Sequence, residues 1–147
     1  MPRILVVDDE EAIRSGLAEV LREEGYEAFE AADANSALTR LRDEVFDLIC
    51  TDVRMPGMDG LELVERVKRE SPETEVIVIT GFASLQSAVD AVKRGAEDYL
   101  SKPFDLDEVR LTVKRALEPR LPVTERLLLE RALDGRRTSS RSNGLER

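Results

Sequence analysis

At 147 residues, of which 41% are hydrophobic, the chain has the size of one ordinary domain and enough apolar side chains for a single core. Its formal net charge of -9 disfavours non-specific binding to nucleic acid or anionic lipid, because the phosphates of both would be repelled. The absence of histidine excludes Ser-His triads and imidazole metal sites, so any chemistry must use carboxylates, hydroxyls, lysine or a bound ion.

The cysteine content and the hydropathy predict a cytoplasmic protein. The one cysteine, Cys50, has no second cysteine with which to form an internal disulfide. No apolar run approaches the roughly 20 residues needed to cross a bilayer, and the run at residues 4–7 is too short for a signal peptide. We therefore expect no contact with a membrane, and we assign Cys50 to the core.

Five short apolar runs alternate along the chain with segments of helical period. Strands are predicted, in chain order, at residues 4–7, 26–31, 47–51, 75–80 and 98–101. This alternation is typical of a parallel sheet covered by helices. The runs at 4–7, 48–50 and 76–79 are apolar throughout, as in central strands, whereas 26–31 alternates and is predicted to lie at an edge.

Each predicted helix has an apolar stripe that we expect to face the sheet. The stripes are Ile13, Leu17, Val20 and Leu21; a weaker one within 36–42; Leu61, Val64 and Val67; Leu85, Ala88, Val89 and Val92; and Leu106, Val109, Val113 and Leu117. Gly25 and Gly95 follow two of these helices at C-cap positions, and Asp105 with Glu108 forms a capping pair for the last. The count is five strands and five helices.

The chain changes character near residue 119, after the proline-containing segment "EPRLP". The first 119 residues contain 15 basic and 27 acidic residues, whereas residues 120–147 contain seven arginines and four acids. We predict a folded domain over 1–119, a linker over 120–133 that can form a short helix, and a flexible tail over 134–147.

Polar residues stand at the carboxyl ends of four predicted strands. Asp8 and Asp9 follow the first strand, Asp52 ends the third, Thr80 ends the fourth and Lys102 ends the fifth. In an open parallel sheet these ends line the ligand crevice. Taken singly, each residue has an ordinary role, such as a helix cap or a solvated charge, so the joint placement carries the prediction.

The residue types at these strand ends indicate phosphoryl chemistry. Three neighbouring carboxylates call for a cation, and hard oxygen ligands select Mg²⁺. A lysine and a hydroxyl facing that ion suit an anion of high charge, and Asp52 is the natural nucleophile, since a carboxylate can form an acyl phosphate. The following turn, "RMPGMDG", would clear the chain from Asp52, with Gly57 and Gly60 in conformations that other residues avoid.

The motifs "VVDDE" at 6–10, "TDVRMPGMDG" at 51–60, "ITGFAS" at 79–84 and "GAEDYLSKPF" at 95–104 closely resemble the receiver domain of two-component response regulators. The resemblance covers about residues 3–118. It implies a flavodoxin-like (βα)5 fold, doubly wound, with a five-stranded parallel sheet in the order 2-1-3-4-5.

By this resemblance Asp52 is the phospho-acceptor. Asp8 and Asp9 form the acidic pair of the Mg²⁺ site, whose ligands include Asp9, Asp52 and the carbonyl of Arg54. The resemblance also implies that Thr80 and Lys102 contact the phosphoryl oxygens, that Tyr99 is an aromatic switch, and that Lys102-Pro103 is a cis peptide.

The leading interpretation is a signalling module rather than an enzyme with its own substrate. A partner histidine kinase would phosphorylate Asp52 and thereby switch the surface of the fourth helix, fifth strand and fifth helix. A phosphorylation-linked homodimer is one expected readout, with Leu111, off the core stripe of the last helix, as a candidate contact.

The chain most resembles receivers that control sigma-54-dependent transcriptional activators, so we expect an output in transcription. Such activators continue into an ATPase and a DNA-binding domain, neither of which this sequence contains; it has no GxxxxGK[ST] loop. A stand-alone receiver in a phosphorelay is one alternative. Another is an aspartate-nucleophile phosphohydrolase, but Arg54 occupies the position of its general acid. A nucleotide-binding domain is a third, but no GxGxxG occurs.

Overall fold

The computed structural model describes residues 1–81, 85–118 and 131–132. The strands are β1 (Arg3–Val7), β2 (Glu27–Ala31), β3 (Leu48–Asp52), β4 (Glu75–Thr80) and β5 (Asp98–Ser101). The helices are α1 (Glu11–Glu23), α2 (Ala34–Asp43), α3 (Gly60–Glu70), α4 (Leu85–Lys93) and α5 (Leu106–Leu117). The predicted alternation of strands and helices is confirmed for this part of the chain.

The chain divides into two units, Met1–Leu117 and Glu118–Arg147. In the second unit the described residues are Glu118 and the helical pair Arg131 and Ala132. The rest of the predicted linker, and the tail predicted for 134–147, lie outside the described residues, so both remain predictions.

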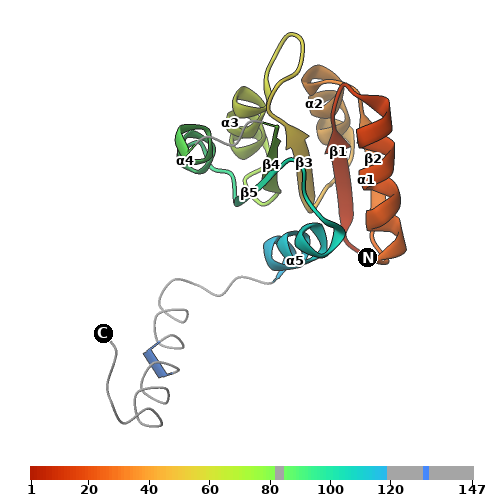
Figure 1. The fold of residues 1–147 in the computed structure, drawn as a ribbon. Helices are drawn as coiled ribbons and strands as arrows, with labels where there is room; N and C mark the ends of the chain where they lie inside the picture. Colours follow the sequence, from red (N-terminus) through yellow and green to blue (C-terminus); the bar gives the residue numbers. More distant parts are fainter. Residues whose placement is uncertain (82–84, 119–130, 133–147) are drawn as a thin grey trace. The chain divides into compact units, whose positions relative to one another are not determined.

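The strands form one parallel sheet in the order β2-β1-β3-β4-β5, as the resemblance implies. The order reverses direction after β1, which lies between β2 and β3 (Figure 1). Parallel pairing brings the carboxyl ends of neighbouring strands to one edge; Asp52, for example, is in register with Ile79. This edge carries the predicted site.

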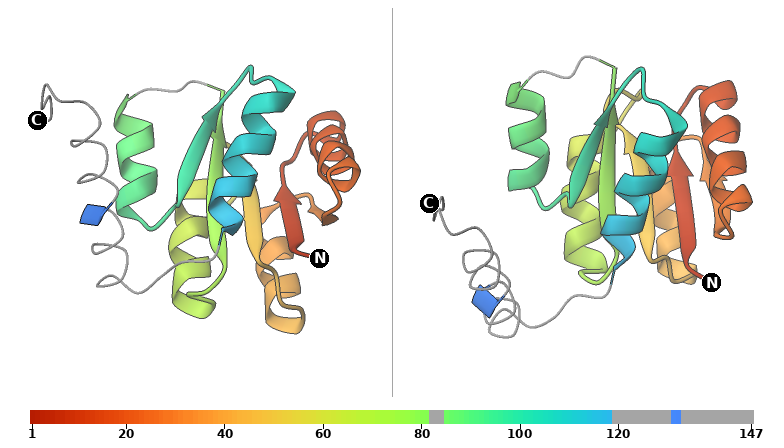
Figure 2. Two further views of the ribbon diagram at one scale, coloured as in Figure 1. Left: turned by 90° about the horizontal axis from the view of Figure 1, so that it is seen from below. Right: turned by 60° about the horizontal axis from the view of Figure 1, so that its bottom comes forward.

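Helices cover both faces of the sheet, so the first unit has three layers. Helices α1 and α5 lie on one face and α2, α3 and α4 on the other (Figure 2). Alternate residues of β1, β3 and β4 point to opposite faces, and helices cover both faces, so the runs 4–7, 48–50 and 76–79 within these strands are apolar throughout. In β3, Ile49 packs toward α2 and α3, while Leu48 and Cys50 pack toward α1 and α5.

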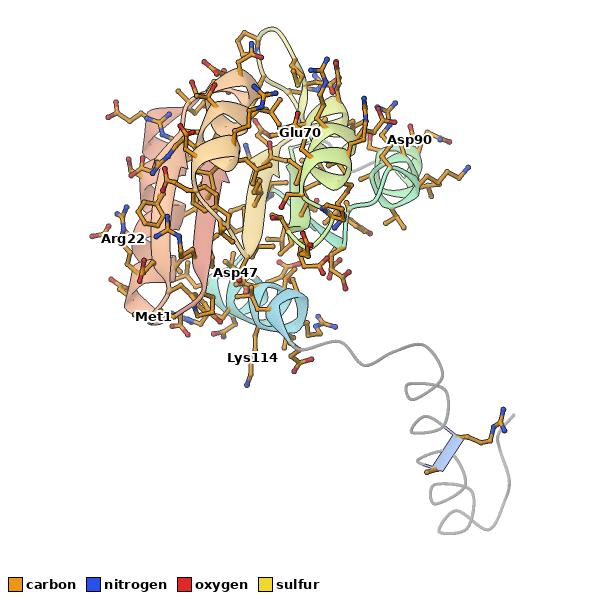
Figure 3. All side chains as sticks on the ribbon, turned by 180° about the vertical axis from the view of Figure 1, so that it is seen from behind. Met1, Arg22, Asp47, Glu70, Asp90 and Lys114 are labelled. Carbon is orange, nitrogen blue, oxygen red and sulfur yellow. The ribbon has the colours of Figure 1, made fainter. Side chains whose placement is uncertain are left out.

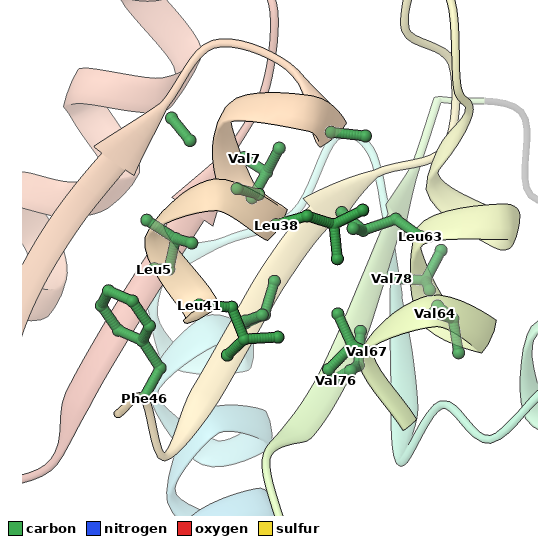
Figure 4. Packing of buried hydrophobic residues seen from close by; sticks show 14 of the residues in the cluster. Leu5, Val7, Leu38, Leu41, Phe46, Leu63, Val64, Val67, Val76 and Val78 are labelled. Carbon is green, nitrogen blue, oxygen red and sulfur yellow. The ribbon is translucent and has the colours of Figure 1, made fainter. Parts of the chain in front are cut away.

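Two largely aliphatic cores result. Figure 4 shows the first, in which Leu38 and Leu41 of α2 meet Leu63, Val64 and Val67 of α3 above the sheet. The second joins α1 and α5 to the opposite face through Leu17, Ala18, Leu21, Val109, Val113 and Ala116. The charged side chains of Arg22 on α1, Glu70 at the end of α3 and Lys114 on α5 lie outside these cores and are exposed (Figure 3).

Two predicted core stripes are partly wrong. Among the described side chains of α4, which do not include that of Leu85, Ala88 and Ala91 are buried, while Val89 and Val92 are 36% and 54% exposed. Small alanines bring this helix close to its neighbours, and the valines are left on the outer side. In α5, Leu106 is 48% exposed, because it is the first residue of the helix, and the inner face begins at Val109.

Strand β2 is an edge of the sheet, as predicted, and its outward carbonyl groups are occupied. On the inner side, the backbone groups of β2 pair with β1 and the residue before it; the Glu27 N–H, for example, donates to the Pro2 carbonyl at 3.0 Å. On the outer side the Arg22 guanidinium donates to the Ala28 carbonyl at 3.2 and 2.7 Å. Arg40 donates to the Glu30 carbonyl at 3.4 Å. Arginines from two helices thus cap this edge.

Among the described helices none combines the length and apolar character needed to span a bilayer.

Candidate functional site

Three carboxylates meet at the carboxyl ends of β1 and β3. Asp8 and Asp9 directly follow β1, and Asp52 is the last residue of β3. Each offers one oxygen, and these oxygens all lie within 4.8 Å of one another. Asp8 and Asp52 are buried, at 2% and 6% exposure, whereas Asp9 is exposed. The structure therefore brings together the three acids that the strand-end pattern singled out.

Lys102 approaches this cluster from the residue after β5. Its Nζ lies 3.6 Å from Asp52 Oδ1 and 3.7 Å from Asp8 Oδ2. The Lys102 backbone N–H donates to the Thr80 carbonyl at 2.8 Å, which fixes the lysine beside the end of β4. The Lys102-Pro103 peptide bond is cis.

The Asp52 carboxylate has a raised pKa. Burial is the largest cause, and the neighbouring Asp8 charge adds to it, while Lys102 acts in the opposite direction. One lysine therefore leaves the charge of the acidic cluster incompletely offset.

These residues fit a Mg²⁺ ion by the chemistry of their donor atoms. The cluster supplies hard carboxylate oxygens from the ends of two adjacent strands, and neither a thiol nor an imidazole is among its members. Mg²⁺ binds such oxygens and retains several water ligands. The side of the cluster at Asp9 is exposed, so solvent can supply those waters. The raised pKa of Asp52 points the same way, because a dication would offset both the burial of this carboxylate and the charge of Asp8. Arg54, two residues beyond Asp52, has an exposed side chain, and the role of its carbonyl stays a prediction.

The two predicted switch residues differ in burial. Thr80, at the end of β4, is 6% exposed, whereas Tyr99, in β5, is 40% exposed. Neither residue lines the open depression of about 470 Å³ that is formed by Ile13, Gly81, Lys102, Pro103 and Phe104. Its walls are largely apolar, and Lys102 connects it to the acidic cluster.

The turn after Asp52 depends on glycine at two points for different reasons. Gly57 has a φ of +80°, in the left-handed region, as predicted. The prediction for Gly60 was wrong in its reason, since this residue does not have a positive φ. A side chain at position 60 would instead collide with the backbone carbonyl of Asp52. The Gly60 N–H donates to the Val53 carbonyl at 2.8 Å, so the start of α3 lies directly against the end of β3.

Sequence reasoning did not identify Arg14 as part of the site. The Arg14 guanidinium donates from Nη1 to the Asp8 carbonyl at 2.9 Å and from Nε to Glu30 Oε1 at 3.1 Å. Its position six residues after Asp8 places it near the first turn of α1, but spacing alone does not reveal a contact that depends on β2.

Comparison with known proteins agrees with this geometry. The response regulator receiver domain family matches residues 4–114. The nitrogen assimilation regulatory protein NtrX of Azorhizobium caulinodans is 44% identical over 117 residues, which cover 78% of this chain and 26% of that protein. Sporulation initiation phosphotransferase F of Bacillus subtilis is 40% identical, covering 78% of this chain and 93% of its own length.

A solved structure gives the same result. The beryllofluoride-activated NtrC4 receiver domain dimer has a TM-score of 0.76 and is 44% identical, with 80% of this chain and 97% of that chain covered. The chain spans about a quarter of the length of the first curated relatives it matches. The family resemblance and the flavodoxin-like fold are confirmed.

Proposed function

Because this chain belongs to the response regulator receiver domain family, we propose that Asp52 accepts a phosphoryl group from a partner histidine kinase in a two-component system. The observation that carries the proposal is the meeting of Asp8, Asp9 and Asp52 with Lys102 at one sheet edge. These 147 residues contain no histidine, so the phosphohistidine donor lies outside this sequence.

The proposed reaction is a direct transfer between two side chains. A carboxylate oxygen of Asp52 attacks the phosphorus of the phosphohistidine; an O–P bond forms and the P–N bond breaks. The imidazole nitrogen keeps the electron pair of the broken bond and takes a proton from solvent. Bound Mg²⁺ would supply neutralisation of the phosphoryl charge, with Asp8, Asp9, Asp52 and the Arg54 carbonyl as its proposed ligands.

Side chains of the protein would position the phosphoryl group and neutralise its charge. Lys102, held by its backbone contact with Thr80, lies where it can pair with a phosphoryl oxygen once Asp52 has lost its own charge to the acyl phosphate. The Thr80 hydroxyl is the proposed second contact. Burial of Asp52 limits water near the acyl phosphate, which favours a lifetime long enough for signalling.

The switch follows from the same contacts. We propose that the phosphoryl oxygens draw Thr80 inward, which leaves space for the ring of Tyr99 to turn from its exposed position. The affected surface comprises α4, β5 and α5, where Val89, Val92 and Leu111 are also exposed. The related NtrC4 receiver domain forms a dimer when activated by beryllofluoride, which supports a homodimer as the readout here.

The proposed output is transcription, supported by relatives with the names transcriptional regulatory protein ZraR and regulatory protein AtoC. We propose a cytoplasmic location, which suits the free thiol of Cys50. A stand-alone role in a phosphorelay is the second candidate, supported by the match along nearly the whole sporulation initiation phosphotransferase F.

The acceptor assignment is tested by labelling. Wild-type protein incubated with a small acyl-phosphate donor and Mg²⁺ should take up one phosphoryl group, and Asp52→Asn should take up none. Asp43→Asn is the matched control, because Asp43 is an exposed aspartate at the end of α2, and it should label like the wild type. Stoichiometric labelling of Asp52→Asn would refute the assignment.

A further inference from the structure

Asp8 is held at every polar atom except one. Its N–H donates to the Ala31 carbonyl at 3.2 Å, its Oδ1 accepts from the Glu10 N–H at 2.9 Å, and its carbonyl accepts from Arg14 Nη1 at 2.9 Å. The remaining atom, Oδ2, is the one that lies 3.7 Å from Lys102. Asp8 therefore presents a single oxygen in one direction.

Arg14 bridges Asp8 to Glu30, a residue outside the acidic cluster. While Nη1 holds the Asp8 carbonyl, Nε donates to Glu30 Oε1 at 3.1 Å, and Glu30 lies in the edge strand β2. The Ser15 hydroxyl donates to the same carboxylate oxygen at 3.0 Å, which fixes the far end of the bridge. The Arg14 side chain is 15% exposed, so packing also restricts it.

From these contacts we propose that Arg14 is a positioning residue for the metal site. By joining the backbone of Asp8 to Glu30 it holds the peptide that carries the Asp8 and Asp9 carboxylates in the geometry that binds Mg²⁺. The inference rests on the proposed metal site, and it assigns Arg14 no contact with the ion or with the phosphoryl group.

A positioning role for Arg14 and a simple effect of its charge predict opposite changes in Mg²⁺ affinity when Arg14 is replaced. Arg14 carries a positive charge near the cation site, so on electrostatic grounds alone its removal should tighten Mg²⁺ binding. If Arg14 acts by positioning, Arg14→Met should weaken binding, by about tenfold, because loss of an outer-shell support of a metal site costs about 10- to 100-fold in affinity.

Two further variants separate bridge from charge. Arg14→Lys keeps the charge but has a single nitrogen, which cannot hold the Asp8 carbonyl and Glu30 in the forked geometry, so it should also weaken binding. Arg22→Met removes an arginine from the same helix that also faces Glu30, at 3.8 Å, but does not touch Asp8. It should leave the Mg²⁺ dissociation constant unchanged or slightly lower.

The experiment is calorimetric titration of the full chain with Mg²⁺, at a temperature where circular dichroism shows each variant folded. Glu30→Gln should weaken binding less than Arg14→Met, and the double variant should bind like Arg14→Met alone. A dissociation constant for Arg14→Met equal to or below the wild-type value, or multiplicative effects in the double variant, would overturn the proposal. Failure of the wild type to bind Mg²⁺ would instead refute the metal site itself.

Discussion

The ammonium nitrogen of Lys102 lies 3.6 Å from Oδ1 of Asp52, yet the pKa of Asp52 is raised. The lysine favours the charged carboxylate, but burial and the charge of Asp8 outweigh it. Without a cation the charged Asp52 carboxylate thus destabilises the folded state.

Asp52→Asn should raise the melting temperature of the metal-free protein near pH 7, by roughly 2–6 °C, because it removes a buried charge that the folded state holds unfavourably. The sign follows from linkage: a carboxyl group with a raised folded pKa binds protons more readily when folded, so its penalty is full above the folded pKa. The penalty disappears as the pH falls toward the unfolded value near 4. Thermal melts at pH 7 and pH 4 in chelator should show the difference shrinking. A lower melting temperature for Asp52→Asn at pH 7 would contradict this account.

Mg²⁺ should stabilise the wild type by mass action, by about 2.7 kcal/mol at 100 times its dissociation constant, since the unfolded chain lacks the site. Asp9→Asn should lose most of this increment. Asp9 is exposed, so its replacement should leave the metal-free melting temperature nearly unchanged. Melts over a range of Mg²⁺ concentrations test both statements, with Asp43→Asn as the control that retains the full increment.

Gly60→Ala should destabilise the domain by about 2 kcal/mol or more, because its methyl group would meet the backbone carbonyl of Asp52. It should also slow labelling of Asp52 by displacing the end of β3. Gly16→Ala is the matched control: Gly16 lies within α1 with no atom near the added methyl group, so it should stabilise the protein by up to about 1 kcal/mol. Urea unfolding of both variants measures this contrast, and equal effects would count against close packing at Gly60.

Phosphorylation should change the sedimentation of micromolar protein if α4, β5 and α5 form the proposed dimer surface. Val92→Glu and Leu111→Glu should each abolish the change, since both residues are more than half exposed on this surface. Val45→Glu, an exposed valine outside α4, β5 and α5, should have no effect. A beryllofluoride complex that sediments like the untreated protein would rule out this dimer.

The Cys50 thiol should be inert in the folded protein. It is buried in β3, and burial raises its pKa to about 12, so little thiolate exists at neutral pH. A thiol-specific reagent should react only as urea unfolds the chain, at a rate that follows the unfolded fraction. Rapid reaction in buffer, with unchanged circular dichroism, would show that β3 opens locally.

The sequence predicted those parts of the fold that depend on local pattern. Runs without polar residues mark β1, β3 and β4 as central strands, and the parallel arrangement then places Asp8, Asp52 and Lys102 together. No contact information is needed for that step, because the strand ends alone determine the edge.

Other features depend on neighbours that are distant in sequence. The outward valines of α4 follow a helical period as well as the buried alanines do, so periodicity could not choose between the two faces. Glycine is required at position 60 because of the backbone of Asp52. The contact of Arg14 depends on Glu30, which is sixteen residues away in β2. These requirements arise only once the sheet has assembled.

The arginine caps on β2 bear on how this protein behaves at high concentration. An edge strand with open carbonyl groups can accept a strand from a second molecule and so begin intermolecular sheet growth. Here an incoming strand would first have to displace Arg22 from the Ala28 carbonyl and Arg40 from the Glu30 carbonyl. The two guanidinium groups come from different helices, so the loss of one leaves the other in place. Strand pairing between molecules through this edge is therefore opposed by two independent contacts.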